Sequence, residues 1–186
     1  MIPILQDEVE AHLIVKIVKE TSDINGELVE VGACLGGSGE LIADNMGSTK
    51  MLTVFDTFDG LLDLQDLDSG GMNSHDLKVS FEDFSPKLKN MDNVKVVKGY
   101  FPDCVEGTDF CNKTFSFVHL DVDTYVSTKN CLSFFHSKMA KGGAIISHDF
   151  GHPSLKGVRL AFDEFYADKG HELLTFDKST QVLVKY

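Results

Sequence analysis

The chain has no tryptophan and few basic residues, and both features limit the kinds of molecule that it can bind. Its 186 residues hold 17 Lys and Arg against 29 Asp and Glu, which gives a formal net charge of −12 at pH 7. So acidic a surface repels phosphate backbones. The 14 phenylalanines, with no tryptophan beside them, indicate core filling rather than a platform for stacking bases. We therefore expect no nucleic-acid partner.

Long apolar runs and paired cysteines are also missing. No stretch approaches the roughly 18 apolar residues of a membrane span, and the N-terminus lacks the basic and apolar regions of a signal peptide. The four cysteines show no Cys-x-x-Cys spacing, which favours reduced thiols in a cytoplasmic protein. A composition of 42% hydrophobic and 25% charged residues predicts one globular domain over residues 1–186.

Strand-like and helix-like patterns alternate along the chain. Strands are expected at 27–32, 51–56, 93–98, 115–121, 143–148, 171–176 and 180–186. Helices are expected at 9–20, 37–46, 80–90, 101–106, 126–140 and 156–167. The turn Asp177–Thr180 is too short for a parallel crossover, so the last two strands pair antiparallel. The sequence thus predicts a doubly wound α/β fold whose seven-stranded sheet contains one reversed strand.

The glycine cluster after the first strand lacks the key residues of two common nucleotide motifs. Glu27–Gly39 reads as a buried strand, a tight turn and the start of a helix. Cys34 replaces the second glycine of a dinucleotide fingerprint, and no Gly-Lys-Ser/Thr follows for a phosphate loop. Glu30, two residues before Gly32, suits a nucleoside ligand that carries ammonium and carboxylate groups. S-adenosylmethionine (SAM) is such a ligand; an ordinary strand–turn–helix is the simpler alternative.

A second buried strand, Leu52–Asp56, ends in an acid. Asp56 follows the glycine turn at close to the roughly 20-residue spacing at which a strand-end acid binds ribose hydroxyls. The alternative is a simple helix cap.

Acids also follow the fourth and fifth expected strands. Asp121 and Asp123 end one, and His148 and Asp149 end the other, so all four should meet at the carboxyl edge of the sheet. Burying several carboxylates together costs free energy unless a bound cation or a proton offsets their charge. Oxygen ligands favour Mg²⁺, whereas the imidazole of His148 favours Mn²⁺, Fe²⁺ or Zn²⁺. Alternatively, Asp121 contacts the cofactor, Asp123 caps the next helix and His148 is structural; His119, inside the strand, is expected to be a core residue.

The segment Asp59–Ser80 is too long and polar for a routine connection. Its glycines and acids are typical of a mobile lid over a substrate, and a disordered surface loop is the alternative.

Together these segments resemble the macrocin O-methyltransferase family, a branch of the class I SAM-dependent methyltransferases with a Rossmann-like fold. The matching pieces are Glu30–Ser38, Phe55–Leu61, Gly99–Asp103, Leu120–Tyr125, Gly142–Gly151 and Gly157–Phe165. Members methylate hydroxyls of sugars on natural products and need Mg²⁺. The resemblance therefore implies transfer of a methyl group from SAM to a small-molecule hydroxyl, a sugar or diol.

The resemblance also implies roles for individual residues. The amino-acid part of SAM is expected at Glu30, Gly32 and Ser38, the ribose at Asp56 and the adenine near Gly99, Tyr100 and Phe101. Further cofactor contacts are expected from Ala33, Gly36, Thr57, Phe58 and Asp121. The expected metal ligands are Asp121, His148 and Asp149, and the catalytic group comprises Asp121, Asp123 and His148, with Asp123 or His148 as the base.

Two departures from the family pattern bear on function. The family usually has an acid where this chain has His148, which bears on the identity of the metal and on whether one is needed. The chain is also short at its N-terminus, where relatives carry helices that shape the acceptor pocket. A different or smaller acceptor, or a pocket completed by a second subunit of a homo-oligomer, would follow.

Two other functions compete with methyl transfer. One is a SAM- or nucleoside-binding protein without methyl transfer, acting as a sensor or interaction partner. The other is a nicotinamide-dependent oxidoreductase, which Cys34 in the glycine turn disfavours.

Overall fold

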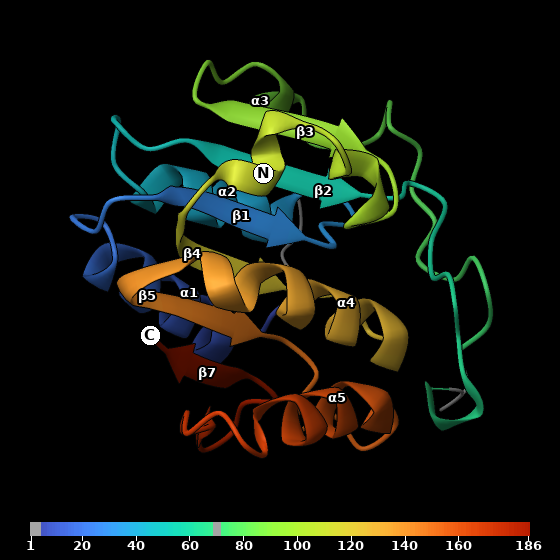
Figure 1. The fold of residues 1–186 in the computed structure, drawn as a ribbon. Helices are drawn as coiled ribbons and strands as arrows, with labels where there is room; N and C mark the ends of the chain where they lie inside the picture. The colour runs from blue at the N-terminus through green and yellow to red at the C-terminus, as the bar shows by residue number, and fades with distance from the viewer. Residues whose placement is uncertain (1–4, 69–71) are drawn as a thin grey trace.

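The computed structural model describes residues 5–68 and 72–186; residues 1–4 of the expected domain and residues 69–71 of the expected lid lie outside it. The described residues form a seven-stranded sheet of order β3-β2-β1-β4-β5-β7-β6 (Figure 1). Its strands are β1 (Glu27–Val31), β2 (Leu52–Asp56), β3 (Val94–Lys98), β4 (Phe115–Leu120), β5 (Met139–Ser147), β6 (Leu174–Thr175) and β7 (Val182–Lys185). The first five strands are parallel, and β7 runs antiparallel to both β5 and β6. The predicted sheet, with its one reversed strand, is confirmed.

Helices cover both faces of this sheet. On one face lie α1 (Glu8–Glu20), α2 (Gly37–Asn45) and α3 (Pro86–Lys89); on the other lie α4 (Tyr125–Phe135) and α5 (Lys156–Tyr166) (Figure 1). Alternate strand residues point to opposite faces, so each face has its own apolar core. Leu28 and Phe117 pack under α1 and α2, whereas Val29 and Val118 pack under α4 and α5. The strongly apolar β4, buried at every position, is the centre of both layers.

The N-terminal helix α1 is fixed at its start by a capping box. The Asp7 carboxylate accepts a hydrogen bond from the Glu10 amide, and the Glu10 side chain reaches back to the Asp7 amide. Two otherwise unpaired amides at the helix start are thereby satisfied. The expected helix at 9–20 is confirmed, and its apolar stripe of Leu13, Ile14 and Ile17 is buried.

Several elements between residues 80 and 176 differ from the sequence prediction. The predicted helix at 80–90 is only α3, because Ser85 caps it and Pro86 occupies its first turn. The predicted helix at 101–106 is the 3₁₀ turn η2 (Asp103–Val105). The predicted helix at 126–140 ends at Phe135, since η4 (His136–Lys138) leads directly into an early start of β5. The strand predicted at 171–176 is only Leu174–Thr175.

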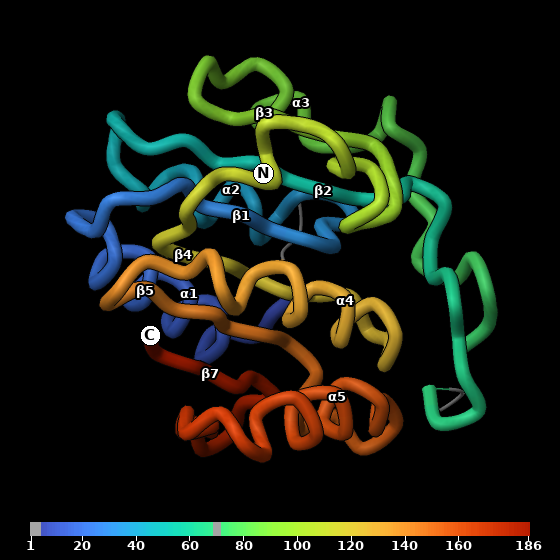
Figure 2. The backbone as a smooth tube through the Cα atoms, viewed as in Figure 1, coloured from blue at the N-terminus to red at the C-terminus, as the bar shows by residue number. Residues whose placement is uncertain are grey.

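The segment after β2 runs outside the sheet and returns, as Figure 2 shows in teal and green. Its ends are paired: the Leu61 amide donates to the Asp76 carbonyl, and the His75 amide donates to the Leu61 carbonyl. Between them, η1 (Asp66–Asp68) places the buried Asp68 against α4, where its Oδ1 accepts from the Tyr125 amide at 2.9 Å. The described part of the segment thus has a fixed anchor, and a closing motion remains a prediction.

None of the helices described has the length and apolar character needed to cross a membrane.

Candidate active site

A cleft opens where β1, β2, β4 and β5 end. Its lining joins the glycine turn, the end of β2 and the acidic residues after β4 and β5, and its empty volume is about 960 Å³ with the open mouth included. Of the expected site residues, those that line it are Gly32, Ala33, Asp56, Thr57, Gly99, Tyr100, Phe101, Asp121, Asp123, His148 and Asp149. The sequence-based rule that ligands bind beyond the carboxyl ends of parallel strands places these residues together, as expected.

The first turn of the cleft depends on a glycine. Gly32 has a φ of 82°, and a Cβ there would lie 1.9 Å from the carbonyl oxygen of Asp121. Any side chain at this position would therefore collide with the end of β4. The glycine is required by the close approach of two strand ends, and that approach draws the turn and Asp121 into one wall of the cleft.

Asp56 fastens this turn. Its Oδ2 accepts hydrogen bonds from the amides of Ala33 (2.8 Å) and Cys34 (2.9 Å), and its Oδ1 accepts from the amide of Phe58 (2.7 Å). An ionised carboxylate has about four acceptor positions. One position therefore remains for a ribose hydroxyl.

Four expected cofactor residues lie outside the lining: Glu30, Gly36, Ser38 and Phe58. Glu30 is fully buried, and its Oε1 pairs with Nδ1 of the equally buried His119 at 3.0 Å. His119 is thus a core residue, as expected from its place inside the strand. Phe58 packs edge-on against Phe81 and Phe84 in the core beneath α2.

The segment expected near the adenine reaches the cleft from the end of β3. Tyr100 lies 3.3 Å, hydroxyl to hydroxyl, from Ser127 of α4. Phe101 stacks on Phe135 with ring centroids 5.0 Å apart. Both rings are therefore held by α4, and they give this end of the cleft an aromatic wall.

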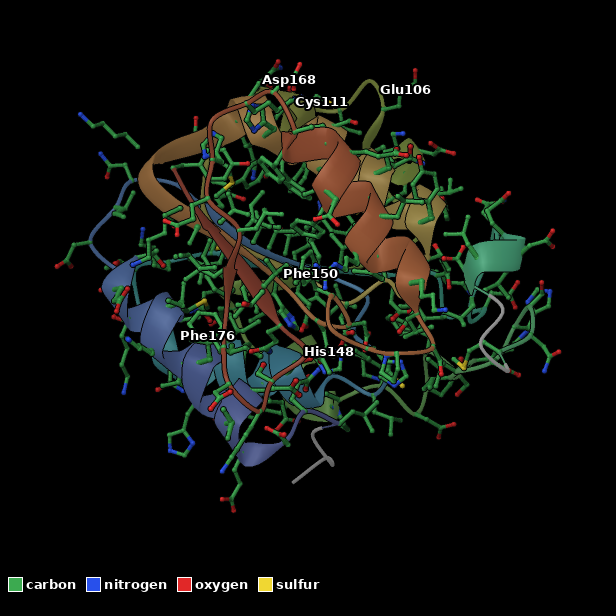
Figure 3. The ribbon with its side chains drawn as sticks, turned by 90° about the horizontal axis from the view of Figure 1, so that it is seen from below. Glu106, Cys111, His148, Phe150, Asp168 and Phe176 are labelled. Carbon is green, nitrogen blue, oxygen red and sulfur yellow. The ribbon has the colours of Figure 1, made fainter. Side chains whose placement is uncertain are left out.

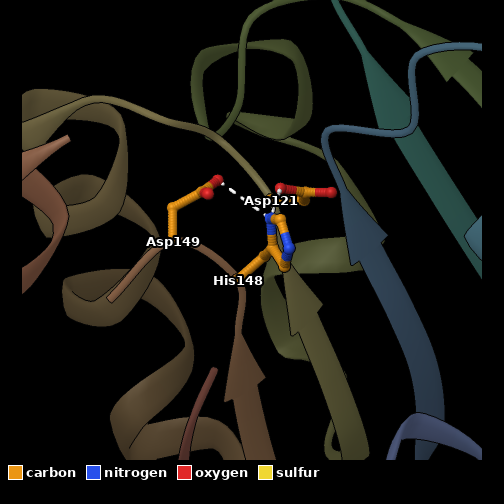
Figure 4. A group of neighbouring side chains, drawn as sticks. All are labelled: Asp121, His148 and Asp149. Atoms are coloured by element: carbon orange, nitrogen blue, oxygen red, sulfur yellow. Dashed lines mark ion pairs between the residues drawn. The ribbon is translucent and has the colours of Figure 1, made fainter. Parts of the chain in front are cut away.

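Three side chains meet at the opposite end of the cleft (Figure 4). Nδ1 of His148 lies 3.2 Å from Asp121 Oδ1 and 3.0 Å from Asp149 Oδ2. The ligand atoms of all three residues lie within 4.8 Å of one another. The predicted meeting of residues from β4 and β5 is observed.

Beyond the end of β5, His148 and Phe150 lie on opposite sides of the sheet (Figure 3), because Asp149 between them has a φ of 62° and interrupts the alternation of an extended strand. Phe150 packs against Phe162 of α5. His148 faces α1, where its Nε2 lies 3.0 Å from Glu10 Oε2. Burial alone would lower the pKa of His148, but its hydrogen bonds and charge interactions with Asp121 and Asp149 raise the pKa to about 12.

Asp123 faces the same cluster in a strained backbone conformation. Its φ is 60°, and that of Asp149 is 62°, a region that residues other than glycine rarely adopt and that is common at functional sites. Burial, followed by the charges of Asp121 and Asp149, raises the pKa of Asp123 well above its ordinary value. The alternative in which Asp123 caps the next helix is wrong, because Thr124 is the N-cap of α4.

Two residues that the sequence interpretation missed complete the cluster. Gln6 donates from Nε2 to Asp121 Oδ2 at 2.8 Å, and Glu10 faces His148; both are buried. Glu10 precedes Ile14 by four positions and so lies on the apolar stripe of α1. An acidic side chain on the buried apolar face of a helix needs a partner. The position of Glu10 on that face was therefore the sequence signal that could have identified it.

The donor set fits a divalent cation. Adjacent ligands of an octahedral ion with 2.1 Å bonds are about 3.0 Å apart, close to the separations between His148 Nδ1 and the two carboxylates. A metal-binding histidine usually donates its other ring N–H to a carboxylate, and Glu10 is in that position. Four carboxyl groups, those of Glu10, Asp121, Asp123 and Asp149, also face one imidazole, and a cation in place of the Nδ1 proton would balance this negative charge.

Comparison with known proteins identifies relatives. A profile of the macrocin-O-methyltransferase (TylF) family matches residues 8–179. The chain is 29% identical, over 175 residues, to the demethyldecarbamoylnovobiocin O-methyltransferase of Streptomyces niveus. The match covers 84% of this chain and 65% of that protein, so the chain spans less than two thirds of this relative's length.

Solved structures share this fold over most of their length. The O-methyltransferase NovP superposes with a TM-score of 0.79 and 25% identity, over 95% of this chain and 78% of that one. The calicheamicin methyltransferase CalS11 gives a TM-score of 0.80 at 17% identity, over 96% of this chain and 79% of that one, a likeness of fold. The Rossmann-like methyltransferase fold and the family resemblance predicted from the sequence are confirmed, and the chain belongs to the macrocin-O-methyltransferase family.

Proposed function

We propose that this protein transfers a methyl group from SAM to a hydroxyl of a small molecule, a sugar or diol, with the help of a divalent cation. One observation carries the proposal: a single cleft contains the glycine turn, Asp56 and the cluster of Asp121, Asp123, His148 and Asp149. Membership in a methyltransferase family supports the reaction type.

SAM fits along the ends of β1, β2 and β3. The spare acceptor position of Asp56 suits a ribose hydroxyl, and the aromatic wall of Tyr100 and Phe101 suits the adenine. The turn at Gly32 and Ala33 lines the part of the cleft that we assign to the amino-acid part of the cofactor. The sulfonium would then lie beside Asp121, between the turn and the acidic cluster.

Asp121, His148 and Asp149 would hold the cation. A cation bound there would lower the pKa of a hydroxyl that it contacts. The imidazole of His148 makes this ligand set softer than three carboxylates, so Mn²⁺, Fe²⁺ or Zn²⁺ should compete well with Mg²⁺.

Asp123 is the proposed base for the acceptor hydroxyl. It lines the cleft beside the cluster, where its carboxyl group shares a hydrogen bond with Asp149, and Thr124 rather than Asp123 caps α4. The chain's further contribution is positioning, since oxygen, methyl carbon and sulfur must be held in line for transfer. The segment 59–80, which borders the cleft through Gly60, Leu61, Leu62 and Leu77, is proposed to limit the access of water.

The mouth of the cleft suggests the shape of the acceptor. Leu5, 63% exposed, and Leu77, 47% exposed, line it together with Leu62. Exposed apolar side chains around a polar cluster favour a molecule with neighbouring hydroxyls and an apolar face. The relative of 29% identity is named for a demethyldecarbamoylnovobiocin substrate, which supports a natural-product acceptor.

Turnover tests the proposal directly. The protein would be incubated with SAM, a panel of sugars and catechol-like diols and each of Mg²⁺ and Mn²⁺, and S-adenosylhomocysteine (SAH) would be quantified. We expect metal-stimulated SAH formation that EDTA abolishes and that Asp123→Asn reduces by roughly 10²–10⁴-fold. Tight SAH binding without turnover on any acceptor would instead favour a SAM-binding protein that transfers no methyl group.

A further inference from the structure

Glu10, on the N-terminal helix, belongs to the candidate active site although it lies far from the cluster in sequence. Its side chain is 5% exposed. Oε2 faces His148 Nε2 at 3.0 Å. Oε1 accepts from the Thr180 amide at 2.9 Å, from the Thr180 hydroxyl at 2.8 Å and from the Ser179 hydroxyl at 3.3 Å. Donors from the turn before β7 therefore fix one oxygen, and the imidazole takes the other.

This arrangement is more than a helix cap needs. A capping box uses one weak contact from Glu10 to the Asp7 amide, here 3.4 Å long. Three donors meet on the other oxygen, Oε1: the Thr180 amide and the hydroxyl groups of Thr180 and Ser179. With donors on both oxygens, the Glu10 carboxylate is the acceptor toward all of these partners.

The consequence falls on the orientation of His148. Because Glu10 can only accept, His148 must present an N–H to it from Nε2. The ring is then held with Nδ1 directed at Asp121 and Asp149, at 3.2 Å and 3.0 Å. Nδ1 is the only ring nitrogen placed to act with both acids.

We propose that Glu10 is a positioning residue that fixes the ring of His148 so that Nδ1, with Asp121 and Asp149, binds a divalent cation. The inference rests on the metal-assisted function proposed above. It makes α1 part of the site, with Glu10 acting through His148 rather than on the acceptor. Outer partners of this kind change metal affinity by about 10–100-fold when removed.

The test compares Glu10→Gln with Glu8→Gln, which makes the same chemical change at an exposed position in the first turn of α1. Calorimetry with MnCl₂ and with SAH measures the two affinities separately. We expect Glu10→Gln to weaken Mn²⁺ binding by about 10–100-fold and to leave SAH affinity within about two-fold, and Glu8→Gln to change neither.

A second readout follows the ring itself. In the metal-free protein, the Nε2–H proton of His148 should give a slowly exchanging NMR signal that Glu10→Gln abolishes and Glu8→Gln preserves. If Glu10→Gln fails to fold, Thr180→Val removes one donor that orients Glu10 and should weaken Mn²⁺ binding in the same direction.

Two results would overturn the inference. The first is a folded Glu10→Gln protein that binds Mn²⁺ as the wild type does and retains the Nε2–H signal. The second is a wild-type protein that binds SAH but no Mn²⁺, which removes the metal role and leaves the SAM site intact. Failure to bind SAH would instead count against the proposed methyl transfer, so the two failures are distinguishable.

Discussion

Replacement of Asp56 by alanine separates two roles of one carboxylate. The sequence predicts ribose binding, and the structure adds three hydrogen bonds from the amides of Ala33, Cys34 and Phe58. If the Asp56 carboxylate only bound ribose, it could be removed with little effect on the stability of the protein. If it also stabilises the glycine turn through these three hydrogen bonds, its removal should lower the free energy of unfolding.

The structure sets the size of both effects. Hydrogen bonds to a charged group contribute about 1.5–3 kcal/mol each, but two of the three amides border an open cleft where water can replace the carboxylate. We therefore expect Asp56→Ala to lower the free energy of unfolding by roughly 2–3 kcal/mol, or Tm by roughly 4–12 °C. The one remaining acceptor position limits the loss of SAH affinity to roughly 10- to 150-fold.

Urea unfolding and calorimetric titration with SAH measure these quantities independently. Asp59→Ala is the control, because it removes a 46%-exposed carboxylate only three positions further along the chain. Exposed ion pairs contribute little to stability because solvent and salt screen them, so the unfolding midpoint of this variant should barely move. An unchanged midpoint for Asp56→Ala would refute the fastening role, and unchanged SAH affinity in the folded variant would refute ribose binding.

Three further predictions concern the metal, the core and the loop. His148→Asp makes the ligand set all oxygen and should raise activity with Mg²⁺ relative to Mn²⁺; an unaltered metal preference would exclude His148 as a ligand. His119→Leu leaves the buried Glu30 unpaired and should lower the free energy of unfolding by about 3–5 kcal/mol, whereas replacing both residues by leucine should restore much of it; equal losses in urea unfolding would contradict this reasoning. Hydrogen exchange of the segment 59–80 should slow when SAH and Mn²⁺ bind together; unchanged exchange would remove the lid from the mechanism.

The sheet could be predicted because parallel strands that are buried on both faces appear in the sequence as short, nearly continuous apolar runs. Leu28–Val31 and Phe115–Leu120 are short apolar runs flanked by turn residues, and the structure buries them on both sides. The region 80–106 was harder, because α3 and η2 are one-turn elements with no amphipathic period to detect. Their bounds follow from local caps and from the prolines at 86 and 102.

The part of the candidate site that lies at the strand ends could be predicted from the sequence. The part that α1 contributes could not. Asp121 and His148 follow adjacent strands, so topology alone brings them together. Glu10 and His148 are 138 positions apart in the sequence, and no local sequence pattern indicates that they are in contact. The same holds for Gln6, whose amide holds Asp121.

Asp121 is the point at which the two halves of the site become one unit. Its amide donates to the Val31 carbonyl at 2.9 Å, and its own carbonyl occupies the space where a side chain at position 32 would lie. Its carboxylate is held by Gln6 on one oxygen and by His148 on the other. A shift of the glycine turn must therefore move Asp121, and with it the acidic cluster. The glycine that suggests a cofactor site in the sequence is thus also a packing requirement, and this packing is what would couple a bound cofactor to the residues proposed to activate the acceptor.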